Sequence, residues 1–330
     1  MRVSVIGTTS WGTTLAVILA RRGIDVSLWA RTDEEAEKLR RDGENTERLP
    51  GMPFPKTLTP VGDIAGALRD VSMVIFAVPS QDMRRNVALA KMHIDIGSLV
   101  LNAAKGFELE TGKRMTQVVS DELGQDYIQN ICTLSGPNLS REIATGLPAA
   151  SVVAAYDIAV AEVARDILHS STFHVYTSDD VVGVELGGAL KNIVALGAGM
   201  VDGLGYGDNA KAAYMSHGLS EIAKLGVALG ANPLTFLGLA GLGDLLATCD
   251  SVLSRNHTLG EGIARGYSLD EMMSTIGSAV EGVPTTVAAL KIARGLGVDM
   301  PITERIYRVL YDGLDPAKAM AELIGDLNHM

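Results

Sequence analysis

Three charged side chains stand in apolar, glycine-rich stretches of the second half of the chain. Lys191 lies in a run of small and apolar residues, Asp244 ends the run Gly-Leu-Ala-Gly-Leu-Gly-Asp, and Arg255 lies between a serine and an asparagine. Burying a charge is costly unless it has a partner. A lysine whose pKa burial can tune, an orienting carboxylate and an arginine for an oxyanion form a usable catalytic set. A structural ion pair between helices would use the same residue types, so the set needs independent support.

The N-terminus supplies that support. Arg2–Ile6 is predicted to form a strand, Gly7 a turn, and residues 11–22 a helix that Gly23 ends. A second strand is predicted over Asp25–Trp29. This order is the opening βαβ unit of a dinucleotide-binding domain, whose pyrophosphate lies at the start of the helix.

The glycine fingerprint of that unit is incomplete. The pattern Gly-x-Gly-x-x-Gly is represented by Gly7-Thr-Thr-Ser-Trp-Gly12, so Thr9 replaces the middle glycine. That glycine normally lets the backbone approach the pyrophosphate. We expect the stiff, β-branched Thr9 side chain to keep the phosphate farther away, and Thr9→Gly to tighten NADPH binding. The alternative is that the Thr9 hydroxyl donates a hydrogen bond to a phosphate oxygen.

Composition narrows the class of protein. A chain of 330 residues favours two domains, and the net charge of −11 argues against a general nucleic-acid binder. The two cysteines and six histidines show no disulfide or metal-ligand spacing, so we predict no metal. No signal peptide and no apolar run of about 18 residues is visible, so we expect a cytoplasmic protein without membrane insertion.

The predicted fold is α/β, with a Rossmann-type, doubly wound, mostly parallel sheet over residues 1–178 and an all-α domain over residues 179–330. Further strands are predicted at 71–78, 98–103, 131–134, 149–154 and 172–176. Further helices are predicted at 33–42, at 158–169 and directly after Ser80, which can cap the helix that follows it. Residues 43–61, with four prolines, are predicted to be irregular. The second half is predicted to be helical at 180–201, 209–229, 233–240, 243–249, 257–265, 269–276, 284–296, 302–312 and 316–327.

Small and polar clusters follow four of the strands. They are Gly7–Gly12, Ala77–Gln81, Ala104–Glu108 and Ser135–Asn138. Ligands of an open parallel sheet bind outside the carboxyl ends of its strands, so we expect these loops to line one crevice. Lys105 directly follows a buried strand, which favours a functional role over a surface one.

Taken together, these motifs resemble bacterial NAD(P)-dependent glycerol-3-phosphate dehydrogenase over essentially the whole chain. The motifs that carry the resemblance are Gly7…Ser10–Thr13, Trp29–Arg31, Leu49–Gly51, Ala77–Ser80, Lys105-Gly106, Ser135–Pro137, Glu185–Asn192, Gly238–Asp244, Ser254–Asn256 and Val280–Gly282. The resemblance implies reduction of dihydroxyacetone phosphate to sn-glycerol 3-phosphate, which feeds glycerophospholipid synthesis.

The resemblance also implies roles for individual positions. Lys191 matches the catalytic acid/base. Substrate contacts are implied for Lys105, Gly136, Asn138, Lys191, Asp244, Ser254, Arg255 and Asn256. Cofactor contacts are implied for Gly7, Ser10, Trp11, Gly12, Arg31, Lys105, Ser140, Arg255 and Glu281. Besides Thr9, the chain departs from the family's usual residues at Asn138, Ser140 and His257.

The cofactors expected are NADP and NAD. An NAD site usually has an acid at the end of the second strand, whereas here Arg31 stands there and no acid occurs before Asp33. We therefore favour NADPH, with NADH tolerated; Arg31 could instead stack on the adenine.

The chemistry of these motifs leaves two alternative functions open. One is another two-domain hydroxy- or keto-acid dehydrogenase, and the other is a cofactor-binding relative without turnover. The apolar, Met-containing helical half suggests a homodimer, although a core could look the same.

Overall fold

The computed structural model describes residues 1–325, and the chain divides into two compact units. Residues 1–104 and 115–181 form unit 1, whereas residues 105–114 join the chain from Val182 onward in unit 2. The short segment Lys105–Arg114 therefore leaves the strands of unit 1 and packs with the helices of unit 2. Each unit is described by itself below.

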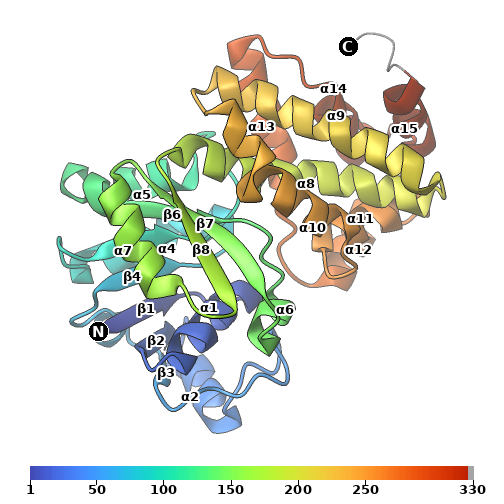
Figure 1. The fold of residues 1–330 in the computed structure, drawn as a ribbon. Coiled ribbons are helices and arrows are strands. Elements are labelled where there is room, and N and C mark those ends of the chain that lie inside the picture. The colour runs from blue at the N-terminus through green and yellow to red at the C-terminus, as the bar shows by residue number, and fades with distance from the viewer. Residues whose placement is uncertain (326–330) are drawn as a thin grey trace. The chain divides into compact units, whose positions relative to one another are not determined.

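Unit 1 is built on one twisted sheet (Figure 1). Its strands are β1 (Arg2–Ile6), β2 (Asp25–Trp29), β3 (Leu58–Val61), β4 (Met73–Phe76), β5 (Leu99–Asn102), β6 (Ile131–Ser135), β7 (Ala149–Ala155) and β8 (Phe173–Ser178). Their order is β3-β2-β1-β4-β5-β6-β7-β8, and only the β6–β7 pair is antiparallel. The strand order reverses between β1 and β4, which is where doubly wound sheets bind their ligands.

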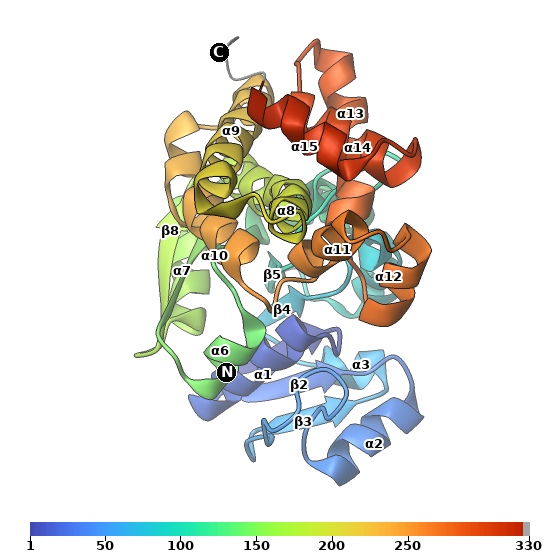
Figure 2. The ribbon, with the colours of Figure 1, turned by 90° about the vertical axis from the view of Figure 1, so that its right-hand side faces the viewer.

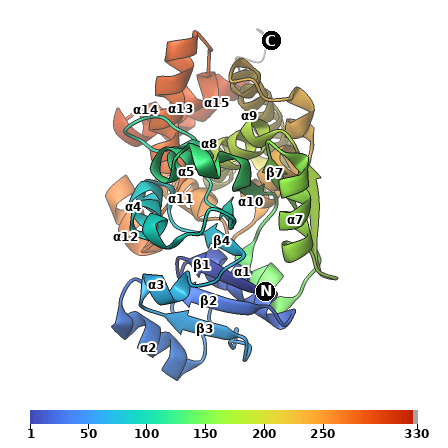
Figure 3. The same ribbon diagram turned by 90° about the vertical axis from the view of Figure 1, so that its left-hand side faces the viewer.

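Helices cover both faces of this sheet. On one face, α1 (Ser10–Arg21), α6 (Ser140–Thr145) and α7 (Ile158–Leu168) pack on inward residues such as Val3 and Val5. On the other, α3 (Ile64–Ala67), α4 (Met83–Ala90) and α5 (Met115–Leu123) pack on residues such as Ile6 and Phe76. Figure 3 shows α4 and α5 side by side on this second face. Burial on both faces explains why the central strands β4, β5 and β6 are buried without alternation, whereas the edge strands β3 and β8 alternate.

Unit 2 is helical and surrounds one long apolar helix, α8 (Val181–Gly203) (Figure 2). The other helices are α9 (Gly207–Ala228), α10 (Asp244–Asp250), α11 (Arg255–Ala264), α12 (Leu269–Ile276), α13 (Gly282–Leu296), α14 (Pro301–Tyr311) and α15 (Pro316–Gly325). Glycines of α8 let neighbouring backbones approach closely; a Cβ on Gly199 would lie 2.0 Å from the carbonyl oxygen of His257. α8 is long and apolar enough to cross a membrane, contrary to our expectation, but 94% of its apolar window is buried inside the protein.

Several predicted elements differ from the observed ones. Residues 58–61, expected to be irregular, form the edge strand β3, where Pro60 is tolerated because an edge strand leaves one side of its backbone unpaired. Helices α3, α5 and α6 were not predicted. Residues 233–240 do not form an α-helix: they form a 3₁₀ turn, η4 (Pro233–Leu237), followed by a π-helical turn, η5 (Leu239–Gly243).

The helix starts and ends of unit 2 are closer to prediction. Ser268 and Glu271 form a capping box at the start of α12, since each side chain bonds the other residue's backbone N–H. Pro316 is the first residue of α15, as expected, but α13 already begins at Gly282, so Pro284 is not its first residue. The last helix was predicted over 316–327; residues 326 and 327 lie outside the described part of the chain.

Candidate active site

The turn between β1 and α1 has the geometry of a dinucleotide-binding turn. Gly7 has a φ of +115°, and a Cβ there would lie 2.7 Å from the carbonyl oxygen of Ala77. A Cβ on Gly12 would lie 2.1 Å from the carbonyl oxygen of Gly7. Neither position can hold a side chain without moving backbone. The first turn of α1 carries no acidic residue, so its N–H groups are suited to an anion. These residues fit the pyrophosphate of a dinucleotide.

Thr9, which replaces the middle fingerprint glycine, is tied into this turn. Its φ of −65° and ψ of 166° are ordinary extended values. Its hydroxyl donates to the carbonyl oxygen of Ala77 at 2.7 Å and accepts from the N–H of Gly12 at 3.0 Å. The hydroxyl therefore caps α1 and joins the β1 turn to the end of β4, and its donor is already used within unit 1.

A buried asparagine braces the turn from the irregular segment before β3. Asn45 is 4% exposed, and its Nδ2 donates to the carbonyl of Thr8 and to Oγ1 of Thr13, both at 2.9 Å. The hydroxyl of Ser10 donates to the carbonyl of Arg48 at 2.7 Å. This segment carries the Leu49-Pro-Gly51 motif, and its local role is to fix the glycine turn.

Trp11, on α1, and Arg31, after β2, are also expected to contact the cofactor. Trp11 packs edge-on against Phe173, with ring centroids 6.3 Å apart, and its indole N–H has no hydrogen-bond partner among the described residues. Arg31 follows β2 and is exposed. A buried indole donor usually has a partner, so the unsatisfied Trp11 N–H leaves a hydrogen bond for a ligand atom.

The loop after β6 holds three more predicted residues. Gly136 has a φ of +137°, and a Cβ there would meet Ser151 Cα at 3.0 Å. Asn138 accepts from the hydroxyl of Ser151, whereas its Nδ2 is buried and finds no acceptor in residues 1–325. Ser140 begins α6, and its carbonyl accepts from Thr14 at 3.2 Å. Glycine is required at 136 because the backbone is left-handed there and closely packed.

Two lysines of unit 2, Lys105 and Lys191, converge on Asp244. Asp244 is 1% exposed and begins α10. Lys105 Nζ lies 2.7 Å from its Oδ2, and Lys191 Nζ donates to its Oδ1 and to the hydroxyl of Thr248. Two ammonium groups thus share one carboxylate. The π-helical turn η5 sets the position of Asp244, and its backbone approaches α8 so closely that a Cβ on Gly187 would lie 2.4 Å from the carbonyl oxygen of Ala240.

Burial lowers the pKa of Lys105 to about 8, from an ordinary value of 10.5. Asp244 opposes the effect of burial and the neighbouring charge of Lys191 adds to it, so the value of about 8 is the net result. The cluster therefore contains a lysine with a lowered pKa at position 105. The side chain of Lys105 is 16% exposed, so it lies at the more accessible side of the pair.

The segment Lys105–Arg114 is anchored in unit 2 at several points. Phe107 is 1% exposed in the apolar core of the unit. Arg114 forms a buried ion pair with Glu185 of α8 at 2.5 Å, and Lys291 of α13 donates to the carbonyl of Glu110 at 3.1 Å. Lys105 is therefore held beside Asp244 by the fold of its own segment rather than by a flexible side chain alone.

The Ser254-Arg255-Asn256 motif begins α11. Ser254 caps the helix by accepting from the N–H of His257, and Arg255 is exposed at its first position. Asn256 is 8% exposed: its Nδ2 donates to Asn192 Oδ1 and its Oδ1 accepts from the N–H of Gly282, both at 2.9 Å. Its amide thus links α11 to α8 and to the start of α13, and the second N–H of Nδ2 is its remaining donor for substrate.

Glu281 stands immediately before that start and is the N-cap residue of α13. The next residue, Gly282, allows no side chain, because a Cβ there would lie 2.7 Å from both the carbonyl of Asn192 and Oδ1 of Asn256. The hydrogen bonds of Asn256 with Asn192 and Gly282 therefore fix the backbone beside Glu281 as well as the start of α11.

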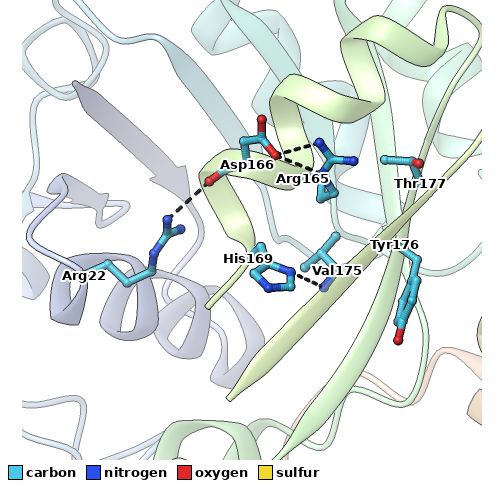
Figure 4. A pocket seen from close by; sticks show the side chains of 7 residues that line it. All are labelled: Arg22, Arg165, Asp166, His169, Val175, Tyr176 and Thr177. Atoms are coloured by element: carbon cyan, nitrogen blue, oxygen red, sulfur yellow. Dashed lines mark hydrogen bonds and ion pairs between the residues drawn. The ribbon is translucent and has the colours of Figure 1, made fainter. Parts of the chain in front are cut away.

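A surface pocket of about 660 Å³ in unit 1 contains none of these residues (Figure 4). Its lining residues are Arg22, Arg165, Asp166, His169, Val175, Tyr176 and Thr177. The guanidinium of Arg22 donates to the carbonyl of Asp166 at 3.2 Å, Arg165 pairs with Asp166 at 2.8 Å, and His169 Nδ1 accepts from the N–H of Val175. These groups are satisfied by one another, as expected for a link between α7 and β8.

Two residues that bond predicted site residues or the glycine turn escaped the sequence analysis. Thr248 lies one helical turn after Asp244 and bonds Lys191; the spacing of four residues was a signal that could have found it. Glu35, on the first turn of α2 (Asp33–Asp42), accepts hydrogen bonds from Thr8 in the glycine turn and from the backbone N–H of Arg31, two residues after β2. Nothing in the sequence spacing reveals the contact of Glu35 with Thr8, because the two residues are 27 positions apart.

Comparison with known proteins agrees with this arrangement. The profile of NAD-dependent glycerol-3-phosphate dehydrogenase N-terminus matches residues 2–161, and that of the C-terminus of the same enzyme matches residues 180–321. A glycerol-3-phosphate dehydrogenase [NAD(P)+] of Dehalococcoides mccartyi is 50% identical over 98% of this chain and 90% of its own length. That of Moorella thermoacetica is 48% identical over 98% and 95%. The crystal structure of the Coxiella burnetii glycerol-3-phosphate dehydrogenase has a TM-score of 0.93, 35% identity and 98% coverage of both chains.

Proposed function

This chain belongs to the NAD-dependent glycerol-3-phosphate dehydrogenase family, and from that premise we propose how its residues divide the work. The enzyme is an NAD(P)-dependent oxidoreductase that reduces dihydroxyacetone phosphate to sn-glycerol 3-phosphate, a precursor for glycerophospholipid synthesis. The observation that carries the assignment of roles is the buried cluster of Lys105, Lys191 and Asp244.

The dinucleotide is held by the turn of unit 1. Gly7 and Gly12 leave room for the pyrophosphate, and the first N–H groups of α1 donate to it. The reduced nicotinamide supplies a hydride to the substrate carbonyl carbon when it is bound. Negative charge then develops on the carbonyl oxygen, so the protein must supply a positive charge and a proton there.

Lys191 supplies that proton. Its ammonium is held by Asp244 and Thr248, which leaves one of its three N–H donors for the carbonyl oxygen. Lys105 adds a second positive charge beside the developing oxyanion. General acid catalysis of this kind typically contributes about 10²–10⁴-fold in rate.

Arg255 holds the substrate phosphate. It stands at the first position of α11, where the guanidinium and the free N–H groups of the helix favour an anion. Ser254 and Asn256 set the start of that helix through their own hydrogen bonds. Binding energy from the phosphate positions the carbonyl for reaction.

The function is tested by mixing the protein with dihydroxyacetone phosphate and NADH or NADPH and following the loss of the reduced cofactor. Arg255→Ala tests whether this arginine holds the substrate phosphate. We expect the variant to raise KM for dihydroxyacetone phosphate by about 10- to 100-fold, since a charged hydrogen bond is worth roughly 1.5–3 kcal/mol. Activity toward dihydroxyacetone, which lacks the phosphate, should change little. Equal losses for both substrates would assign Arg255 a structural role.

The cellular location and the oligomeric state of the protein stay predictions. A cytoplasmic location is supported by the burial of α8, and fractionation of cells tests it. A homodimer is supported by exposed apolar side chains of unit 2 such as Leu234, Leu237 and Val252. Sedimentation equilibrium of the wild-type protein tests the dimer, and a monomer at micromolar concentration would contradict it.

A further inference from the structure

Glu35 joins the two structural features that flank the adenosine side of a dinucleotide site. Its Oε1 accepts from the hydroxyl of Thr8, in the glycine turn, at 2.5 Å. Its Oε2 accepts from the backbone N–H of Arg31, two residues after β2, at 3.0 Å. Glu35 is partly buried and lies on the first turn of α2, where Thr32 caps the helix. The carboxylate is thus held in place from both sides.

The fold places a ribose next to this carboxylate. In a Rossmann-type unit the pyrophosphate lies at the start of the first helix, and the adenosine ribose lies by the end of the second strand. A group held between the glycine turn and the end of β2 therefore faces the ribose 2′ position. The acid that usually does this follows the strand directly; here Glu35 reaches the same place from the next helix.

We propose that Glu35 is a cofactor-specificity residue that makes this enzyme favour NADH over NADPH. The inference rests on the proposed function, because it needs a dinucleotide bound in the ordinary orientation. A carboxylate has about four acceptor sites, and Glu35 uses two, so it can still accept from a ribose 2′-hydroxyl. A 2′-phosphate has no such proton to give and carries negative charge, so the carboxylate repels it.

Arg31 does not remove this repulsion. Its guanidinium makes no hydrogen bond or ion pair with any residue of the described chain, and its side chain is exposed. Ordering a free arginine around a phosphate costs side-chain entropy, whereas the carboxylate is already fixed. The expectation of NADPH preference, drawn from Arg31 alone, is therefore reversed by the position of Glu35.

The test measures cofactor binding without turnover. Isothermal titration of the full-length protein gives Kd for NADH and NADPH, and for the fragments AMP and 2′,5′-ADP, which differ in the 2′-phosphate. The variant is Glu35→Gln, which removes the charge and keeps the shape. The matched control is Glu34→Gln, which removes the same charge from the neighbouring, exposed position of α2.

We expect the wild type to bind NADH at least about ten-fold more tightly than NADPH, a difference of about 1.4 kcal/mol. Glu35→Gln should reduce that ratio by about ten-fold, mainly by tightening NADPH, and should do the same for 2′,5′-ADP against AMP. Salt should narrow the wild-type ratio and leave that of Glu35→Gln nearly unchanged. Glu34→Gln should keep the wild-type ratio.

Three results would overturn the inference: a wild type that prefers NADPH, a Glu35→Gln ratio no different from that of Glu34→Gln, or equal weakening of all four ligands by Glu35→Gln. The last result would assign Glu35 a purely structural role. Failure of the proposed function is distinguishable, because it would appear as an absence of dihydroxyacetone phosphate reduction, whereas these titrations measure only the affinity for the cofactors and their fragments.

Discussion

The Thr9 hydroxyl donates a 2.7 Å hydrogen bond to the carbonyl of Ala77, so one side chain joins the glycine turn after β1 to the end of β4. These are the two strands between which the order of the sheet reverses. The same hydroxyl accepts from the N–H of Gly12 and caps α1. The residue that breaks the glycine fingerprint is therefore also a structural link across the expected ligand site.

Removal of that link should destabilise unit 1. Thr9→Val keeps the shape of the side chain and loses both hydrogen bonds, so we expect the free energy of unfolding to fall by about 1–3 kcal/mol. Thr9→Ser keeps the hydroxyl and should change it by less than about 0.5 kcal/mol. Urea unfolding of both variants, followed by circular dichroism, makes the comparison. Similar losses in the two variants would show that the methyl group, not the hydroxyl, matters.

Thr9→Gly tests the steric expectation drawn from the sequence. Glycine removes the side chain, but it also releases the turn, which then has to be ordered when the cofactor binds. We expect the affinity for NADH and NADPH to stay the same or to weaken by a few-fold. Calorimetric titration decides: tighter binding would support the view that the Thr9 side chain obstructs the pyrophosphate.

Deprotonation of Lys105 should lower the activity of the enzyme at alkaline pH. Burial lowers its pKa to about 8, so above that pH the neutral amine replaces the positive charge beside the substrate. We expect kcat/KM to fall with a limb near this pKa, because kcat/KM reports groups of the free enzyme. Lys105→Arg should move the limb upward, since arginine stays protonated. Asp244→Asn, which removes the carboxylate that raises this pKa, should move it downward.

The lowered pKa of Lys105 also makes the free energy of unfolding depend on pH. Between about pH 8 and pH 10.5 the unfolded chain holds a proton on Lys105 that the folded chain has lost. The contribution of this residue to stability therefore rises with pH across that window, and it is least favourable below it. A Lys105→Met variant should lack this rise in denaturant titrations at a series of pH values, whereas wild-type-like behaviour would assign the titration to another group.

Lys191→Met should remove turnover while leaving cofactor binding nearly intact. The change deletes the group placed to protonate the carbonyl oxygen, and Asp244 keeps Lys105 as an ionic partner. We expect kcat to fall by about 10²-fold or more. Stopped-flow single turnovers with pre-bound cofactor measure the chemical step, and calorimetry measures NADH affinity. A variant that kept about a tenth of wild-type kcat would remove Lys191 from the role of acid.

The opening βαβ unit could be predicted because its signals are local: a strand, a left-handed glycine and a helix in sequence. The edge strand β3 could not, because Pro60 is compatible with a strand only where one side of the backbone is unpaired, and that depends on the sheet order. The charged set of Lys191, Asp244 and Arg255 could be nominated from residue type. The lowered pKa of Lys105 could not be predicted, because it depends on burial and on which groups share Asp244.

Glu221 of α9 offers a stability test away from the active site. It is 5% exposed and accepts from the N–H groups of Ile302 and Thr303 and from the Thr303 hydroxyl, at 2.6–2.9 Å. These are the first free N–H groups of α14, which has no side-chain cap hydrogen bond of its own. Burial raises the pKa of Glu221, and the three hydrogen bonds oppose that rise.

Glu221→Ala should leave those N–H donors buried without an acceptor, so we expect the free energy of unfolding to fall by about 2–4 kcal/mol. The matched control is Glu304→Ala, which removes an acid of α14 whose ion pair with Arg294 is solvent-exposed and should cost less than about 1 kcal/mol. Because the pKa of Glu221 is raised in the folded state, its contribution to stability is fully present below the ordinary pKa of 4.5 and decreases as pH rises through the folded pKa. The wild-type advantage over Glu221→Ala should therefore shrink from mildly acidic to neutral pH. An advantage that grew with pH would mean that the three hydrogen bonds outweigh burial and that the pKa of Glu221 is lowered.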